Sequence, residues 1–328
     1  MTAYSVLDLS PVIEGGDIAR ALHETTRYAQ AADRLGFTRF WLAEHHNMPG
    51  IASAATAVVI GHVAGATQRI RVGSGGVMLP NHAPLVVAEQ FGTLEALYPG
   101  RIDLGLGRAP GTDGATAKAL RRYFEAADQF PRDVLELQAF LAPPVEGQQV
   151  TAWPGAGSRV PIWLLGSSLF SAELAAQLGL PFAFASHFAP ELLMQALAVY
   201  RQGFRPSEAL ARPYAMAAIN VIAADTDEEA QRLSTSMQQA FAAVITGKSG
   251  RLKPPIDDIT AVLTPQHLAA VESRLAHAAI GGPETVRTRL ADFVAATGVD
   301  EVMVTGMVHD VDARIRSLEI TAEAAGLA

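Results

Sequence analysis

The stretch from residue 69 to residue 113 constrains the fold of this chain more than any other. It contains two short apolar segments, Ile70–Ser74 and Ile102–Gly107, in which polar and apolar residues do not alternate. Such segments are typical of parallel strands that are covered on both faces. Gly75–Gly76 predicts a turn after the first segment, and a helix is predicted to begin near Pro84. The stretch therefore predicts a strand–helix–strand unit of a parallel sheet.

The same alternation of strands and helices continues along the chain. Helix start and stop signals lie between the apolar segments, such as Asp17 as an N-cap and Gly36 at a helix end. The strand candidates are 5–9, 39–43, 70–74, 102–107, 161–165, 182–185, 214–223 and 301–305. Eight strand–helix units predict an α/β fold, a (β/α)8 TIM barrel, with insertions near 109–160 and 246–282. We expect residues 1–328 to form a single domain.

Composition and charge restrict the classes of partner. The chain has 328 residues, of which 49% are hydrophobic and 18% are charged, enough for a large core. A net charge of −8 gives no basic surface for nucleic acid, and the absence of cysteine excludes disulfides, thiolate nucleophiles and cysteine-based zinc sites. The first twenty residues show no secretory signal, and the apolar segment 51–66 is too short to span a membrane. We therefore predict a cytoplasmic protein that binds small molecules.

Polar and glycine residues gather where the predicted strands end, which in β/α barrels is the side that binds ligands. At Ser74, Gly75 and Gly76 the backbone could pass close to a flat ligand, because glycine has no Cβ. Arg108 follows the next strand and offers a charged fork that suits phosphate. The alternative is that the glycines only shape a tight turn and that Arg108 is a solvated loop residue.

A dinucleotide-binding fingerprint is the competing interpretation of Gly105–Pro110. Its spacing fails, because Pro110 stands where the third glycine of the G-x-G-x-x-G pattern belongs. No helical pattern follows at once, and Pro110–Gly114 predicts a loop. We therefore set the fingerprint aside.

Three serines, Ser167, Ser168 and Ser171, lie at the predicted start of the helix that follows segment 161–165. Hydroxyls, free backbone N–H groups and the helix dipole all favour an anion there. Ordinary N-capping by serine is the alternative. The strands that precede the serines and Arg108 would be neighbours in the barrel, so these side chains could face the same anion.

The motif Glu44-His45-His46 follows the second predicted strand. His45 is the leading candidate for proton transfer, because imidazole titrates near neutral pH, and a structural histidine is the alternative. A metal site in this motif is not expected, since neighbouring residues of an extended strand point to opposite faces. The three lysines of the chain all lie outside the predicted strands, so a Schiff-base enzyme is not expected. From the residues alone we predict a barrel enzyme that binds a phosphorylated cofactor.

Three segments, Trp41–His46, Val72–Arg108 and Pro161–Pro190, closely resemble the bacterial luciferase-like family of flavin-dependent monooxygenases. The resemblance spans nearly the whole chain. It implies a β/α barrel that holds reduced FMN at its carboxyl face and uses O2 to oxidise a substrate. Gly107 stands where light-emitting members can carry a reactive cysteine, so the resemblance does not imply bioluminescence.

The resemblance also implies roles for individual residues. His45 matches the active-site histidine that assists the oxygen chemistry of the flavin. Gly75–Gly76 falls where the family often has a non-proline cis peptide bond beneath the flavin ring. Arg108, Ser168 and Ser171 match phosphate contacts. The expected cofactor-binding residues are Glu44, Ser74, Gly75, Gly76, Arg108, Ser167, Ser168 and Ser171.

The cofactor and the partners are expected on the same grounds. No reductase domain is visible, so a separate flavin reductase would supply reduced FMN. Some members of the superfamily use the deazaflavin F420 for hydride transfer, and a non-catalytic flavin-binding protein is a further alternative. The alanine-rich second and third helices predict a homodimer interface or else a buried helix layer. Segment 246–264 could form an active-site lid, and the substrate is left unassigned.

Overall fold

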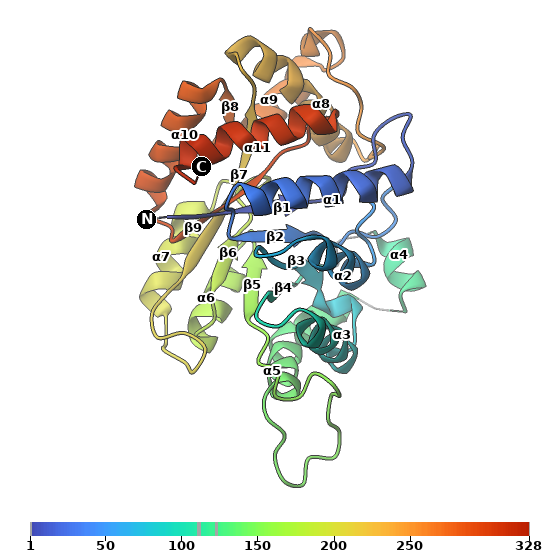
Figure 1. The fold of residues 1–328 in the computed structure, drawn as a ribbon, viewed down its shortest axis with the longest axis vertical. Coiled ribbons are helices and arrows are strands. Elements are labelled where there is room, and N and C mark those ends of the chain that lie inside the picture. The colour runs from blue at the N-terminus through green and yellow to red at the C-terminus, as the bar shows by residue number, and fades with distance from the viewer. Residues whose placement is uncertain (1, 110–112, 122–123, 328) are drawn as a thin grey trace.

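The computed structural model describes residues 2–109, 113–121 and 124–327, and its strands form a closed parallel barrel (Figure 1). The order around the barrel is β1-β2-β3-β4-β5-β6-β7-β9, and β9 pairs with β1 to close it. The predicted (β/α)8 barrel is confirmed. Its strands are β1 (Ala3–Asp8), β2 (Arg39–Leu42), β3 (Arg71–Met78), β4 (Ile102–Gly107), β5 (Ile162–Gly166), β6 (Phe182–Phe184), β7 (Ala215–Ala223) and β9 (Glu301–Thr305).

Helices surround the barrel, and the first is capped at the predicted residue. Asp17 accepts a hydrogen bond from the N–H of Arg20, and Thr226 caps the eighth helix by accepting one from the N–H of Glu229. In the described part of the chain no helix is both long and apolar enough to cross a lipid bilayer. The helices are α1 (Ile18–Arg34), α2 (Thr56–Ala66), α3 (Pro84–Leu97), α4 (Gly114–Ala119), α5 (Phe130–Leu141), α6 (Leu169–Leu178), α7 (Leu193–Gly203), α8 (Asp227–Ile245), α9 (Pro265–Arg274), α10 (Pro283–Thr297) and α11 (Val311–Ala325).

The glycine pair of β3 corrects one prediction. Gly75–Gly76 lies inside the strand and not in a turn, and the register with β4 shifts between Ser74 and Val77. A Cβ added at Gly76 would lie 2.8 Å from the carbonyl oxygen of Gly105. The glycines therefore let β3 approach β4 closely around a local bulge. The Gly75–Gly76 peptide bond is cis, as the resemblance implies.

The interior of the barrel is filled by side chains. Trp41 and Trp163 meet edge to face with their ring centroids 5.2 Å apart, and Trp163 meets Tyr214 in the same way at 5.6 Å. Leu7 and Met303 belong to the same buried cluster. Because the barrel is a packed core, a ligand has to bind at its mouth, above the carboxyl ends of the strands.

A network of charged side chains closes the opposite, amino-terminal end of the barrel. The buried Asp103 carboxylate accepts hydrogen bonds from Arg39 at 2.7 Å and from Arg71 at 2.6 Å. Arg39 also donates to Glu301 at 3.0 Å, and the hydroxyl of Tyr214 donates to Glu301 at 2.9 Å. All five residues lie at or next to the first residues of their strands, so this network is remote from the mouth.

The second insertion contains elements that the sequence patterns did not predict. Helix α9 and the short strand β8 (Ala279–Gly281) follow the irregular segment 246–258 and the turn η3 (Ile259–Ala261). β8 pairs with the end of β7 outside the barrel wall, where Val221 lies opposite Ala279. A separate buried cluster, here called the insertion core, packs beneath these elements. It includes Ile222, Ala230, Leu233, Met237, Phe241 and Val271.

The first insertion contains α4, the turn η2 (Phe124–Gln129) and α5. Residues 110–112, expected to form part of a loop, lie outside the described residues.

Candidate active site

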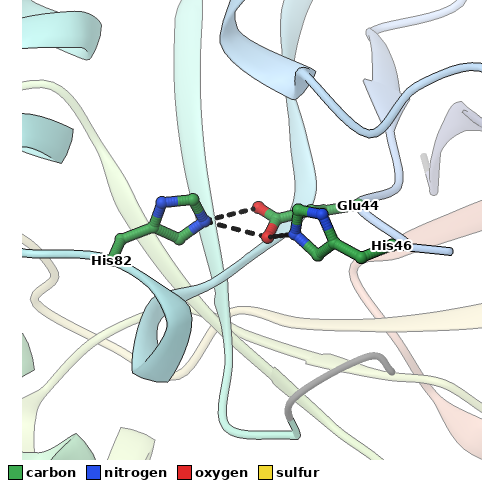
Figure 2. Close-up of side chains that lie close together, drawn as sticks. All are labelled: Glu44, His46 and His82. Atoms are coloured by element: carbon green, nitrogen blue, oxygen red, sulfur yellow. Dashed lines mark hydrogen bonds and ion pairs between the residues drawn. The ribbon is translucent and has the colours of Figure 1, made fainter. Parts of the chain in front are cut away.

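Glu44 is the centre of a hydrogen-bonded cluster that follows β2. Its carboxylate is almost completely buried and accepts hydrogen bonds from Nε2 of His46 at 2.8 Å and from Nε2 of His82 at 2.9 Å (Figure 2). The backbone N–H of Met78 donates to the same carboxylate at 3.3 Å. Glu44 therefore ties the end of β2 to the end of β3. His82 was missed in the sequence because it follows the short turn η1 (Leu79–Asn81) and ends no strand of its own.

The cluster keeps Glu44 ionised. Burial by itself raises the pKa of this carboxyl, but hydrogen bonds from His82 and His46 and their charges bring the pKa below its ordinary value. The three ligand atoms lie within 4.8 Å of one another, and a carboxylate with two imidazoles is a set that zinc or iron accepts. Hydrogen bonds among these residues satisfy the carboxylate without a metal. Both oxygens of Glu44 are engaged by protein groups, and its contact with a cofactor stays a prediction.

His45 lies close to a second histidine, His187, at the barrel mouth. The two follow β2 and β6, which lie on opposite sides of the barrel. Burial, with the nearby charge of His45, lowers the pKa of His187 to about 4. His187 is therefore neutral at pH 7. In the described part of the chain its buried Nδ1 has no hydrogen-bond partner, so this atom is available to a ligand.

Arg108 lies against the start of α6. Its guanidinium stacks on the ring of Phe170, 4.1 Å from the ring centroid, and Phe170 belongs to the first turn of that helix. β4 pairs directly with β5, which confirms the expected neighbourhood of Arg108 and the serine cluster. Arg108 forms no ion pair with any residue that the structure describes. Its charge is therefore available to an anion at the N-terminus of α6.

The serines of this region differ in their environments. Ser168 is the N-cap residue of α6, but its side chain makes no capping hydrogen bond. Ser167 and Ser168 are both half-buried. Ser171 is buried next to Gly166. A Cβ added at Gly166 would lie 2.3 Å from Oγ of Ser171. The hydroxyl of Ser168 is therefore not committed to the helix end, whereas Ser171 fixes the approach of the loop that precedes α6.

Ser74 joins two strands. Its buried hydroxyl donates to the carbonyl oxygen of Gly105 at 2.9 Å and accepts from the N–H of Gly105 at 3.0 Å. The sequence prediction placed this side chain among the cofactor contacts. In the structure its hydrogen-bonding groups link β3 to β4.

A cavity of about 410 Å³ lies between the ends of β1 and β9, the end of α8 and segment 246–253. Lys248, Arg251 and Lys253 line it, as does the buried ion pair of Asp8 and Arg314. Leu252 holds the segment in place, because its N–H donates to Val12 at 2.9 Å and its carbonyl accepts from Glu14 at 2.7 Å. Segment 246–264 thus contributes to the wall of a cavity.

Comparison with known proteins places these features among related chains. The model of the family described as luciferase-like monooxygenase matches residues 5–301. A luciferase-like monooxygenase of Escherichia coli (strain K12) is 52% identical over 319 residues, which cover 97% of this chain and 95% of that protein. The N-acetyl-S-alkylcysteine monooxygenase of Bacillus subtilis (strain 168) is 37% identical over 255 residues, 76% of this chain and 75% of that protein.

Solved structures agree with the fold. The crystal structure of apo-MsnO8 superimposes with a TM-score of 0.91 at 37% identity and covers 100% of this chain and 99% of its own. The oxygenating constituent of 3,6-diketocamphane monooxygenase from Pseudomonas putida, in complex with FMN, gives a TM-score of 0.75 at 19% identity, covering 98% of this chain and 97% of its own. An F420-dependent secondary alcohol dehydrogenase gives a TM-score of 0.72 at 15% identity, and the match covers 98% of this chain and 98% of that protein. At these two lower identities the likeness shows the fold alone.

Proposed function

The chain belongs to the luciferase-like monooxygenase family and is an oxidoreductase, and from this premise we propose that it uses reduced FMN and O2 to oxidise a small organic substrate. The observation that carries the choice of a phosphorylated flavin is Arg108 at the start of α6. The alternative within the same fold is an F420-dependent dehydrogenase, and a non-catalytic flavin-binding protein is a second.

The residues at the start of α6 fit a phosphate group. Arg108 offers a planar fork, the first turn of α6 offers backbone N–H groups, and the side chain of Ser168 makes no capping hydrogen bond. Hydrogen bonds to charged groups contribute about 1.5–3 kcal/mol each. The Gly75–Gly76 segment, without Cβ atoms, would lie next to the flavin ring.

Bound FMN would supply the reaction of reduced flavin with O2. The chain itself would fix the phosphate, exclude water and hold a proton over the barrel mouth. His45 is the candidate for moving that proton, and the neutral His187 can donate or accept a hydrogen bond beside it. Glu44 would fix the segment that carries His45 through its bonds to His82 and Met78.

Anaerobic titration with reduced FMN and with reduced F420, followed by admission of O2, tests the proposal. We expect tight binding of reduced FMN, and oxidation kinetics of the bound flavin that differ from those of free flavin. Preference for F420 with no response to O2 would assign the protein to the dehydrogenases. Binding of oxidised FMN alone would favour a flavin-binding protein without catalysis.

Arg108→Ala tests the phosphate site separately. We expect the affinity for FMN to fall by about 10-fold to 100-fold, since a charge-assisted contact is lost, and the affinity for riboflavin to change little. Arg212→Ala, at an exposed position before β7, is the matched control. Equal losses for FMN and riboflavin would contradict the assignment of Arg108 to the phosphate.

Two partners complete the proposal. A separate flavin reductase would deliver reduced FMN. A second copy of the chain would pack on α2 and α3, because Val58, Val86 and Leu97 on these helices are apolar and exposed.

A further inference from the structure

The wall of the cavity carries an excess of positive side chains in a chain of net negative charge. The net charge is −8, and the lysines are Lys118, Lys248 and Lys253. Two of these three line the cavity together with Arg251. Three cationic side chains around one opening favour anions there, because nearby charges of one sign raise the local concentration of the opposite sign.

These cations are not neutralised by neighbouring carboxylates. Lys248, Arg251 and Lys253 form no ion pair with any residue in the described ranges. Arg251 donates to the carbonyl oxygen of Gly16 at 2.8 Å, which fixes its segment beside α1. Asp17, on the adjoining loop, instead caps α1.

The charged pair within the cavity is self-contained. The buried carboxylate of Asp8 accepts hydrogen bonds from Arg314 and, at 2.9 Å, from Thr25. Arg314 also lies over the ring of Tyr28, 3.9 Å from its centroid. A ligand anion would therefore meet Lys248, Lys253 and Arg251, because the charge of Arg314 is already paired with Asp8.

Most of the remaining wall is apolar. The side chains include Leu9, Met48, Ile51, Ala243, Leu263 and Met307. Such a wall takes up a hydrocarbon body, while the charged rim orients a polar group. The cavity is therefore matched to a molecule that is apolar along its length and negative at one end.

We propose that this cavity binds the substrate and that the substrate is an organic acid, with an apolar body in the cavity and a carboxylate at Lys248 and Lys253. This inference rests on the proposed monooxygenase function. The cavity adjoins β1 and β9, and the proposed phosphate site adjoins β4 and β5. β2 and β6, which precede His45 and His187, lie between these two pairs of strands around the barrel. The apolar end of the acid would then face the flavin.

Isothermal titration calorimetry with octanoate, octanamide and octylamine tests the charge preference on the full chain, with and without FMN. We expect octanoate to bind about threefold to tenfold more tightly than octanamide, because each exposed ion pair contributes modestly, and octylamine to bind most weakly. The preference should shrink at high salt, since solvent-exposed charges are screened.

The double variant Lys248→Gln/Lys253→Gln should lose the preference for octanoate and keep the affinity for octanamide. Lys118→Gln, on the exposed face of α4, is the matched control and should behave as the wild type. Equal binding of octanoate and octanamide by the wild type, or no binding of either, overturns the inference.

The two proposals fail in different ways. Tight binding of reduced FMN with no preference for octanoate would leave the monooxygenase proposal in place and remove the organic acid. A preference for octanoate that depends on the two lysines, with no binding of reduced FMN, would show an acid-binding cavity and contradict the proposed function.

Discussion

At the scale of single residues, two histidines at the barrel mouth have different tasks. His45 is the candidate that moves a proton, and His187 is a neutral group whose Nδ1 lacks a partner among the described residues. Glu44 holds the adjacent backbone through His82 and Met78. The roles of His45 and His187 each make a separate prediction.

His45→Ala should abolish turnover and leave flavin binding within about threefold of wild type, since proton transfer contributes about 10²-fold to 10⁴-fold to a rate. Two quantities are measured: the rate of product formation and the rate at which bound reduced FMN is oxidised. His23→Ala, at an exposed position on α1, is the control. Unchanged turnover and oxidation kinetics in His45→Ala would remove the role of His45.

His187 should make the folded state sensitive to mild acid. Its pKa is about 4 in the folded protein, below the ordinary histidine pKa of 6.5, so between these values only the unfolded chain binds the proton. The folded state therefore has its full stability with respect to His187 above pH 6.5, and it loses this stability as the pH falls toward 4. The slope from one such group is at most about 1.4 kcal/mol per pH unit.

Urea unfolding at several pH values between 7 and 4.5 measures this effect. His187→Asn should lose less stability over that range than the wild type, because asparagine does not titrate. His23→Asn should follow the wild-type curve. A parallel decline of His187→Asn and wild type would show that other groups cause the acid sensitivity.

At the scale of elements, the strands are held at their amino ends by charge. The carboxylate of Asp103 on β4 accepts hydrogen bonds from Arg39 on β2 and Arg71 on β3. Arg39 also donates a hydrogen bond to Glu301 on β9. This network joins strands that are far apart in the sequence. It lies at the end opposite the mouth, so its effect should fall on stability and not on ligand binding.

Asp103→Asn should destabilise the fold by about 3 kcal/mol or more, because breaking a buried ion pair leaves charge without compensation. The measurement is the free energy of unfolding in urea. Glu284→Gln is the control: it removes an exposed ion pair with Arg287 and should change the free energy of unfolding little. If FMN affinity fell while stability held, the network would belong to the active site after all.

Elements set by local patterns could be predicted from the sequence. The rules of capping and burial act within a few residues. Capping applies to Asp17 and Thr226 at the starts of their helices, and burial applies to the strand Ile102–Gly107. Gly75–Gly76 was assigned to a turn because glycine is rare in strands, whereas its place in β3 depends on the approach of Gly105 in the next strand.

Features that depend on distant partners could not be predicted. β8 is three residues long and is defined only by its pairing with β7. His82 gains its place in the cluster from Glu44, and the hydroxyl of Ser74 finds its partners in Gly105. The sequence could thus indicate a candidate site from the ends of the strands, while the partners of its side chains depended on the folded barrel.

At the scale of the whole molecule, the outer face of α2 and α3 carries exposed apolar side chains. Val58 is 73% exposed and Leu97 is 63% exposed. The sequence allowed either a buried helix layer or a dimer interface for these helices. A second copy of the chain would cover this face.

Val58→Glu should shift the protein from dimer to monomer, since a charge would be buried in the interface. Light scattering after size-exclusion chromatography measures the mass. Met194→Glu, at an exposed apolar position on α7, is the control. A wild-type protein that runs as a monomer at micromolar concentration would contradict the interface.

The insertion core has a consequence for how such proteins diversify. Met237 and Val271 pack with Ile222 in a cluster distinct from the barrel's own, and β8 attaches the insertion along the end of β7. Residues 225–282 therefore form a cassette that could be exchanged between relatives as one piece. A chimaera carrying a relative's cassette should keep the flavin chemistry proposed for this barrel and acquire the substrate range of the donor.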